Sequence, residues 1–230
     1  MSEAISRYAF VLLLVPLLVL ADDPQPVDVI RGATDSVLAE LDAAPEIRND
    51  PVKLTRLIQD HIAPHVDLVA LSRLTLGKHW RQATQEQRDA FAREFGTLLI
   101  KTYSAALAEY ANQEVEYLSS EVSADKRRTT VRTRIVEDGR APLAVDYSLR
   151  QLENGWKIYD LSIEGVSLAI NYRSSFAQEI RDHGIDGLIE RLTLHNGHAN
   201  GKTKAAQTAA AHPRQECHSP LRWQPQPLRC

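Results

Sequence analysis

Residues 143–150 read LAVDYSLR, and this short stretch decides the fold class. Its large apolar side chains occupy every second position, at Leu143, Val145, Tyr147 and Leu149, while the residues between them are small, polar or charged. A period of two residues is typical of a β-strand that has one face buried and the other in water. The chain is therefore predicted to contain a sheet with one covered face.

Three further stretches carry strand-like patterns, over residues 115–122, 129–136 and 155–164. The dipeptides Asp138-Gly139 and Asn154-Gly155 lie between consecutive stretches, and both accept the positive φ angles that tight hairpins require. We therefore expect a four-stranded antiparallel sheet in which each strand pairs with the next strand along the chain.

The residues before the sheet indicate several helices. From Pro26 onward apolar residues recur every three or four positions, which is the helical period. Asp50-Pro51 combines a capping residue with a proline at the first helical position and predicts a helix over residues 51–62. A further short helix is expected to end near Gly77.

The clearest helix is expected over residues 85–111. Thr84 and the Glu86-Gln87 pair after it partly match a capping box, which marks a helix start. One face of this helix carries an apolar stripe, formed by Phe91, Phe95, Leu98, Leu99, Tyr103, Leu107 and Tyr110. After the sheet, residues 167–183 and 186–194 are also predicted to be helical. The order of helices, strands and helices predicts an α+β fold, with a four-stranded antiparallel sheet packed against several helices on one face.

The two ends of the chain differ from the part between them. Residues 9–21 (AFVLLLVPLLVLA) are apolar, follow Arg7 and precede two aspartates, which is the pattern of a secretory signal peptide. We expect residues 1–21 to be removed after Ala21 and the mature protein to be exported. Residues 22–195 are expected to form one folded domain, and residues 196–230 a disordered basic tail.

Charge and cysteine content limit the possible partners. The folded part is acidic, although the whole chain has a formal net charge of only −3, and an acidic body argues against nucleic-acid binding. Both cysteines, Cys217 and Cys230, lie in the expected tail, where they could pair with each other. The sequence therefore predicts no zinc site, no redox motif and no cofactor.

Sequence motifs of catalysis are absent, because the chain has no glycine-rich phosphate loop, nucleophile elbow or zinc-protease helix. His61 and His65 have a spacing that could place both on one helix face, but Pro64 interrupts such a helix. Asp160 is a weak candidate for a general base, and we predict no catalytic residue. The apolar side chains of the helices and the sheet fit a packed core or the lining of a pocket, because both have the same periodicity.

Three stretches resemble one known family. They are residues 72–81 (SRLTLGKHWR) with 83–88 (ATQEQR), residues 155–167 (GWKIYDLSIEGVS), and residues 171–174 (NYRS) with 184–188 (GIDGL). In this order they resemble the MlaC family, also called toluene-tolerance auxiliary proteins, which are periplasmic phospholipid carriers of Gram-negative bacteria. The resemblance spans about residues 28–194 and leaves the tail unaccounted for.

The resemblance implies that the fold encloses an apolar pocket for acyl chains and has no enzymatic activity. On this basis the expected lipid-binding residues are Leu74, Leu76, Trp80, Phe95, Leu99, Tyr103, Tyr147, Ile158, Leu161, Ile163, Val166, Leu168 and Tyr172. The implied cargo is phospholipid. The implied partners are an outer-membrane lipoprotein and porin complex (MlaA-like) and an inner-membrane ABC transporter with a lipid-binding ring (MlaD-like). The implied role is to maintain the lipid asymmetry of the outer membrane.

Two alternatives stay open on the sequence. Helices on a curved antiparallel sheet also form the conical pocket of ketosteroid-isomerase-like enzymes, in which Tyr147, Tyr159 and Asp160 could be the donor and base. A periplasmic adaptor with a solid core and no ligand would need no pocket at all.

Overall fold

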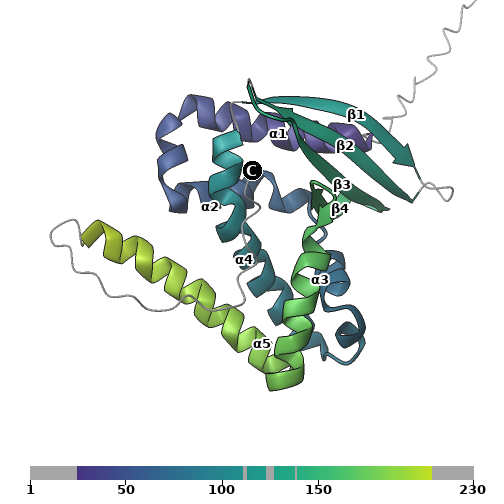
Figure 1. Ribbon diagram of the computed structural model, residues 1–230, viewed down its shortest axis with the longest axis vertical. Helices are drawn as coiled ribbons and strands as arrows, with labels where there is room; N and C mark the ends of the chain where they lie inside the picture. Colours follow the sequence, from purple (N-terminus) through teal and green to yellow (C-terminus); the bar gives the residue numbers. More distant parts are fainter. Residues whose placement is uncertain (1–24, 111–112, 123–126, 138, 209–230) are drawn as a thin grey trace, which may run out of the picture.

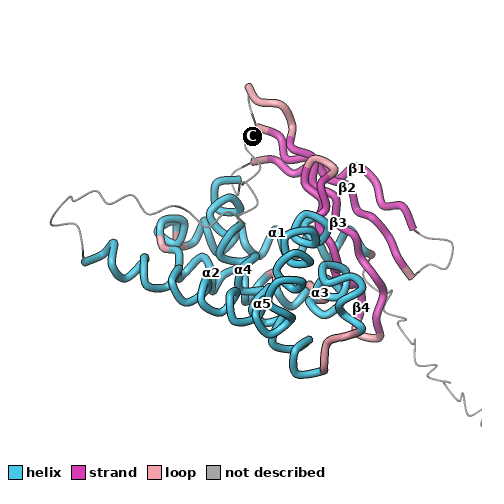
Figure 2. Tube along the Cα trace, turned by 60° about the horizontal axis from the view of Figure 1, so that its bottom comes forward, coloured by secondary structure: helices cyan, strands magenta, loops and turns pink. Residues whose placement is uncertain are grey.

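The computed structural model of the protein describes residues 25–110, 113–122, 127–137 and 139–208 (Figure 1). The strands form one sheet, and the described helices gather on one side of it (Figure 2). The predicted α+β class is confirmed. The proposed signal peptide, residues 1–21, lies outside the described residues.

Five α-helices and three short 3-10 helices surround the sheet in the described part of the chain. The α-helices are α1 (Pro26–Ala43), α2 (Pro51–His61), α3 (Leu68–Leu76), α4 (Gln85–Tyr110) and α5 (Leu168–Thr208). The 3-10 helices are η1 (Pro45–Asn49), η2 (Ala63–His65) and η3 (Gly77–Arg81). The strands are β1 (Glu114–Val122), β2 (Arg128–Val136), β3 (Leu143–Leu152), β4 (Gly155–Ile163) and β5 (Val166–Ser167).

The sheet is an antiparallel meander in the order β1-β2-β3-β4-β5, so it has one strand more than the four expected. The added strand β5 is two residues long and pairs with β4 through Ile163 and Val166. Glu164 and Gly165 make the turn between them, both with positive φ angles. A strand of two residues has no alternation to detect, and for that reason the sequence pattern did not indicate it.

The strand register places the apolar residues of neighbouring strands on one face. Val131 pairs with Tyr147, and Tyr147 pairs with Leu161. Residues directly opposite each other in neighbouring strands project to the same side of a sheet. This side faces the helices and is called the inner face below.

Helix α4 begins at the expected residue with a reciprocal cap. The backbone N–H of Gln87 donates to the Thr84 hydroxyl (3.2 Å), and the backbone N–H of Thr84 donates to the Gln87 side chain (3.0 Å). A capping box satisfies two backbone N–H groups that would otherwise have no partner in the helix. It fixes the direction of the long helix on which several other elements pack.

Three clusters of buried side chains form the core. The aromatic cluster joins α3, α4 and α5 and consists of Leu71, Leu76, Phe91, Phe95, Leu98, Ala169, Tyr172, Phe176, Ile180, Leu188 and Leu192. The helix cluster joins α1, η1, α2 and the end of α4 and consists of Val37, Leu41, Ile47, Leu54, Leu57 and Ala108. The sheet cluster joins α1 to the inner face and consists of Ile30, Val131, Leu149, Trp156 and Ile158.

The C-terminal region differs from the expectation of a disordered tail from residue 196. Gly184 is not helical (φ 75°, ψ 178°) and divides α5 near the expected break, but helix then continues to Thr208. Asn196 is buried, and its side-chain amide donates to the carbonyl oxygen and the carboxylate of Glu94 (3.0 and 2.8 Å). Alanine, lysine and glutamine favour helix strongly, so the low hydrophobicity after residue 196 did not prevent one. Residues 209–230, with both cysteines, lie outside the described residues.

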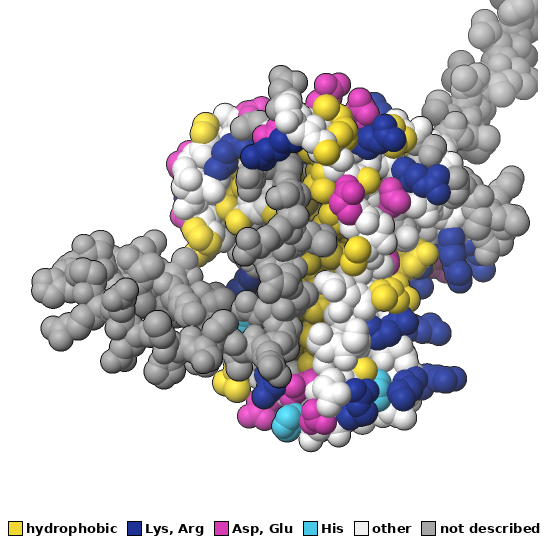
Figure 3. All heavy atoms as spheres, viewed as in Figure 1, with side chains coloured by type: hydrophobic (Ala, Val, Ile, Leu, Met, Phe, Trp, Pro, Cys, Tyr) yellow, Lys and Arg dark blue, Asp and Glu magenta, His cyan; other side chains and the backbone are white. Residues whose placement is uncertain are grey.

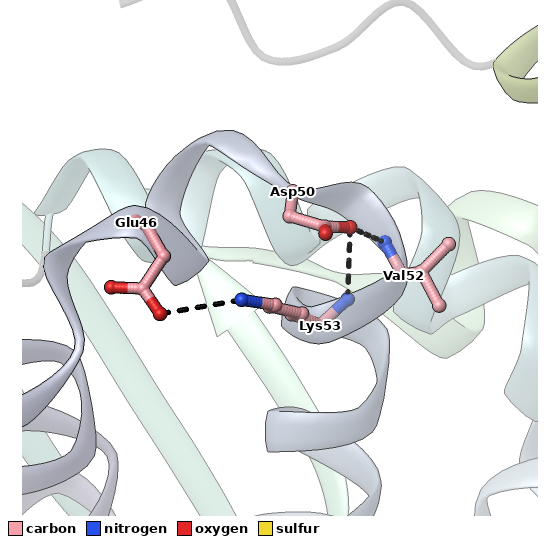
Figure 4. Close-up of polar contacts among 4 residues, drawn as sticks. All are labelled: Glu46, Asp50, Val52 and Lys53. Carbon is pink, nitrogen blue, oxygen red and sulfur yellow. Dashed lines mark hydrogen bonds and ion pairs between the residues drawn. The ribbon is translucent and has the colours of Figure 1, made fainter. Parts of the chain in front are cut away.

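Helix α2 begins at Pro51 as predicted, with Asp50 as its N-cap (Figure 4). One carboxylate oxygen of Asp50 accepts hydrogen bonds from the backbone N–H groups of Val52 (2.9 Å) and Lys53 (3.2 Å). The Lys53 ammonium also contacts Glu46 of η1 at 3.3 Å. The cap therefore fixes the corner between η1 and α2.

We predict that Asp50→Ala lowers the free energy of unfolding by about 1 kcal/mol, because two backbone donors lose their acceptor. Urea denaturation measures the change. The control is Asp60→Ala, which removes an exposed carboxylate paired with Arg56 near the other end of the same helix and is expected to cost less than about 0.5 kcal/mol. Equal losses in the two variants would contradict the capping role.

Candidate functional site

An apolar cleft lies between α1 and the inner face of the sheet. Its open volume is about 100 Å³. The residues that line it are Ile30, Ala33, Thr34, Val37, Leu38, Ile62, Leu107, Gln113, Val115, Ile135, Tyr147 and Ile158. In the space-filling view, hydrophobic side chains are visible in the hollow beside the sheet (Figure 3).

The helical and strand periods together build this cleft. Ile30, Ala33 and Val37 are three or four positions apart and lie on one face of α1. Opposite them, Val115 of β1 pairs with Ile135 of β2, and both contribute to the lining. The cleft is therefore bounded by a helix face on one side and a sheet face on the other.

Helix α1 is anchored at two separate places, and the cleft lies between them. Ile30 belongs to the sheet cluster, whereas Val37 and Leu41 belong to the helix cluster. A further contact joins α1 to α2, where the imidazole of His61 contacts the carboxylate of Glu40 at 2.6 Å. The middle of α1 thus spans a space that neither cluster fills.

Tyr147 is a polar residue in the lining of the cleft. Its hydroxyl forms a hydrogen bond with Thr133, and burial raises the pKa of the Tyr147 phenol to about 12. The Thr133 hydroxyl in turn donates to the carbonyl oxygen of Val145 (2.9 Å). Tyr147 therefore stays protonated at physiological pH, where it can donate a hydrogen bond but cannot act as a base.

Asp160 has a structural role. Its carboxylate accepts hydrogen bonds from the Ser167 hydroxyl (2.5 Å) and from the backbone N–H of Ala169 (3.3 Å), at the start of α5. Asp160 pairs with Ser148 and Leu161 pairs with Tyr147, so Asp160 and Tyr147 project from opposite faces of the sheet. The structure does not bring these two residues together as a catalytic pair.

The structure brings only part of the expected lipid-binding set to the cleft. Tyr147 and Ile158 line it. Leu161 and Ile163 share the inner face with Tyr147 but are half-buried beyond the lining. Val166 lies on the edge strand β5, is 42% exposed and is not one of the residues that line the cleft.

The remaining expected residues belong to the helical layer. Leu76, Phe95 and Tyr172 are members of the aromatic cluster, and Leu74, Trp80 and Leu99 pack against it. Tyr103 is hydrogen-bonded to Tyr172, and Leu168 is buried at the start of α5. None of these side chains is among the residues that line the cleft, so their contact with a lipid stays a prediction. Apolar residues that recur at helical spacing can face either another helix or a pocket.

The sequence analysis missed the α1 side of the cleft. Ile30, Ala33, Thr34, Val37 and Leu38 come from one helix face whose apolar spacing was visible in the sequence. The three stretches that carry the family resemblance begin at residue 72, and residues before them were therefore not considered as lining. Helical periodicity alone could have identified the apolar face of α1, but not the sheet face that lies opposite it.

The described residues contain no group of three or more His, Cys, Asp or Glu side chains that could hold a metal ion. Within the same residues, no helix is both long and apolar enough to cross a membrane.

Comparison with known proteins identifies the family. The model of the MlaC protein family matches residues 31–193, and this chain therefore belongs to the MlaC family. It is 26% identical over 174 residues to the intermembrane phospholipid transport system binding protein MlaC of Haemophilus influenzae, covering 74% of this chain and 81% of that one. It is 28% identical over 196 residues to the toluene tolerance protein ttg2D of Pseudomonas putida, covering 84% and 88%.

A solved structure shares the fold. It is the phospholipid-binding protein of Ralstonia solanacearum, determined in complex with a phospholipid, with a TM-score of 0.69 and 34% sequence identity. The likeness covers 75% of this chain and 97% of that one. The predicted family is thus confirmed.

We predict that the cleft tolerates a larger side chain and that the aromatic cluster does not. Ala33 and Ala169 are both buried, but Ala33 faces the cleft and Ala169 is enclosed in the cluster. Ala33→Phe should change the free energy of unfolding of lipid-free protein by less than about 1 kcal/mol, whereas Ala169→Phe should cost at least about 1–3 kcal/mol through overpacking. Urea denaturation compares them, and equal losses would count against an open cleft.

Proposed function

We propose that this protein binds phospholipid with the acyl chains in the cleft between α1 and the sheet, and that it carries the lipid through the periplasm. The observation that supports this best is the apolar lining that a helix face and a sheet face supply together. The family and the lipid-bound Ralstonia relative support the same assignment. Polar groups are few in the lining, as a site for hydrocarbon requires.

The volume of the cleft bears on how lipid enters it. About 100 Å³ is room for a few water molecules and far less than two acyl chains occupy. Lipid binding therefore requires α1 and the sheet to move apart. The aromatic cluster contains no residue of α1 or of the inner face, so it can stay packed during this motion.

The energetics of release imply transfer by direct contact. Each buried methylene contributes about 0.8 kcal/mol, so two acyl chains represent on the order of 20 kcal/mol. Release of such a cargo into water is negligibly slow. We propose that the protein exchanges lipid while docked to an outer-membrane lipoprotein and porin complex on one side, and to an inner-membrane ABC transporter with a lipid-binding ring on the other. This exchange would maintain the lipid asymmetry of the outer membrane.

An isomerase-like activity has less support. Such a site needs a carboxylate base near a tyrosine donor within one apolar pocket. Here the Asp160 carboxylate caps α5 from the opposite face of the sheet, and Tyr147 lies in the cleft without it. A binding protein without catalysis is the better proposal.

Lipid load tests the proposed function. Native mass spectrometry of protein purified from the periplasm of a Gram-negative host should detect bound phospholipid. Ala33→Phe should reduce the bound fraction several-fold because the new ring occupies the space that acyl chains need. An exposed control, Arg93→Gln on α4, should keep the full load. Lipid-free wild-type protein, or an unchanged load in Ala33→Phe, would contradict the assignment of the cleft.

Export is tested separately. The intact mass of the periplasmic protein should correspond to a chain that begins at Asp22, because a signal peptide is cleaved on export. A mass that still includes residues 1–21 would contradict the predicted cleavage.

A further inference from the structure

Four residues form a polar group at the edge of the cleft, where α1 meets β1. Thr34 lines the cleft and forms a hydrogen bond with the Tyr117 hydroxyl. The guanidinium carbon of Arg31 lies 4.6 Å from the centre of the Tyr117 ring. Asp35 follows Thr34 on α1, close enough to Tyr117 for its charge to act on the phenol. The group thus carries one positive charge, one negative charge and two hydroxyls.

Both charges are available to a ligand. Arg31 and Asp35 are exposed, and neither forms an ion pair with another residue that the structure describes. The guanidinium of Arg31 lies over the Tyr117 ring, and a guanidinium has several N–H groups that can donate to an anion. Burial raises the pKa of Tyr117, so its hydroxyl stays protonated and can also donate.

The spacing of the charges defines the ligand chemistry. Arg31 and Asp35 are four residues apart on one helix, and side chains at this spacing are neighbours, with Cβ atoms about 5–6 Å apart. A phosphodiester that carries an ammonium group two carbons away would fit such a pair. The phosphate would meet Arg31 and the ammonium Asp35. An anionic head group without an ammonium would face the Asp35 carboxylate unfavourably.

We propose that Arg31, Thr34, Asp35 and Tyr117 bind the head group of a zwitterionic aminoalkyl phospholipid whose acyl chains enter the cleft. This inference rests on the proposed function, because the acyl chains must occupy the adjacent cleft. The polar group adds selectivity between head groups, which the apolar lining cannot provide. The mechanism is charge pairing at the water-exposed edge, so the effect on selectivity is modest compared with the energy of burying the chains.

The test is a competition between two head groups. Delipidated mature protein is equilibrated with vesicles that contain equal amounts of phosphatidylethanolamine and phosphatidylglycerol with identical acyl chains. Native mass spectrometry then gives both the total lipid load and the ratio of head groups. Wild-type protein should be enriched in phosphatidylethanolamine about two- to five-fold, the range that an exposed charge pair supports.

Two variants separate the roles of the charges. Asp35→Asn should lose the enrichment while keeping the total load, and Arg31→Gln should lower the uptake of both lipids. Asp182→Asn and Arg93→Gln change the same formal charges on α5 and α4 and should behave like wild-type protein. Circular dichroism checks that every variant is folded.

The outcomes distinguish the two proposals. Normal lipid uptake with equal head groups, or an enrichment that Asp35→Asn leaves intact, overturns the head-group site and leaves the lipid-binding function standing. Failure of the wild-type protein to take up either lipid overturns both.

Discussion

The apolar inner face of the sheet must be covered, and the way in which α1 covers it determines the rest of the structure. Ile30 attaches one end of α1 to Val131, Leu149 and Ile158 of the sheet, whereas Val37 and Leu41 attach the other end to α2 and α4. A straight helix cannot follow both surfaces closely. The lining between the two attachments is apolar, and the space that it encloses is not filled by side chains. This space is the cleft.

The aromatic cluster holds the helical layer together without any residue of α1. Phe91, Phe95, Tyr172 and Phe176 form five ring pairs with centres 5.3–5.7 Å apart, of which three are edge-on, one is stacked and one is tilted. Arg173 of α5 adds a polar contact within the same layer by donating to the carbonyl oxygen of Leu74 on α3 (3.1 Å). These contacts join α3, α4 and α5 and include no residue of α1, which packs against the end of α4 in the helix cluster instead.

The helices and strands could be predicted from the sequence better than the site could, for physical reasons. The alternation at Leu143 to Leu149 and the caps at Asp50 and Thr84 are local signals, and the structure contains the strand and both helix starts. The cleft depends on which apolar faces meet. Phe95 and Ile30 have equivalent periodic patterns, yet one packs in the aromatic cluster and the other borders the cleft. The family motifs contain Leu76 and Tyr172, which pack in the aromatic cluster and hold the helical layer together. The helix side of the cleft lining comes mainly from α1 instead.

The cleft has a small volume because exposing hydrocarbon to water costs free energy. Separation of α1 from the sheet uncovers side chains such as Val37, Leu38 and Ile135, at about 25 cal/mol for each Å² of apolar surface. In the proposed function this cost would favour the narrow cleft when no ligand is bound. Acyl chains bound in the cleft would cover the same surface and would therefore shift the population toward an open form. In the proposed function binding and opening would be coupled in this way, and the lining would become accessible where hydrocarbon is available to fill it.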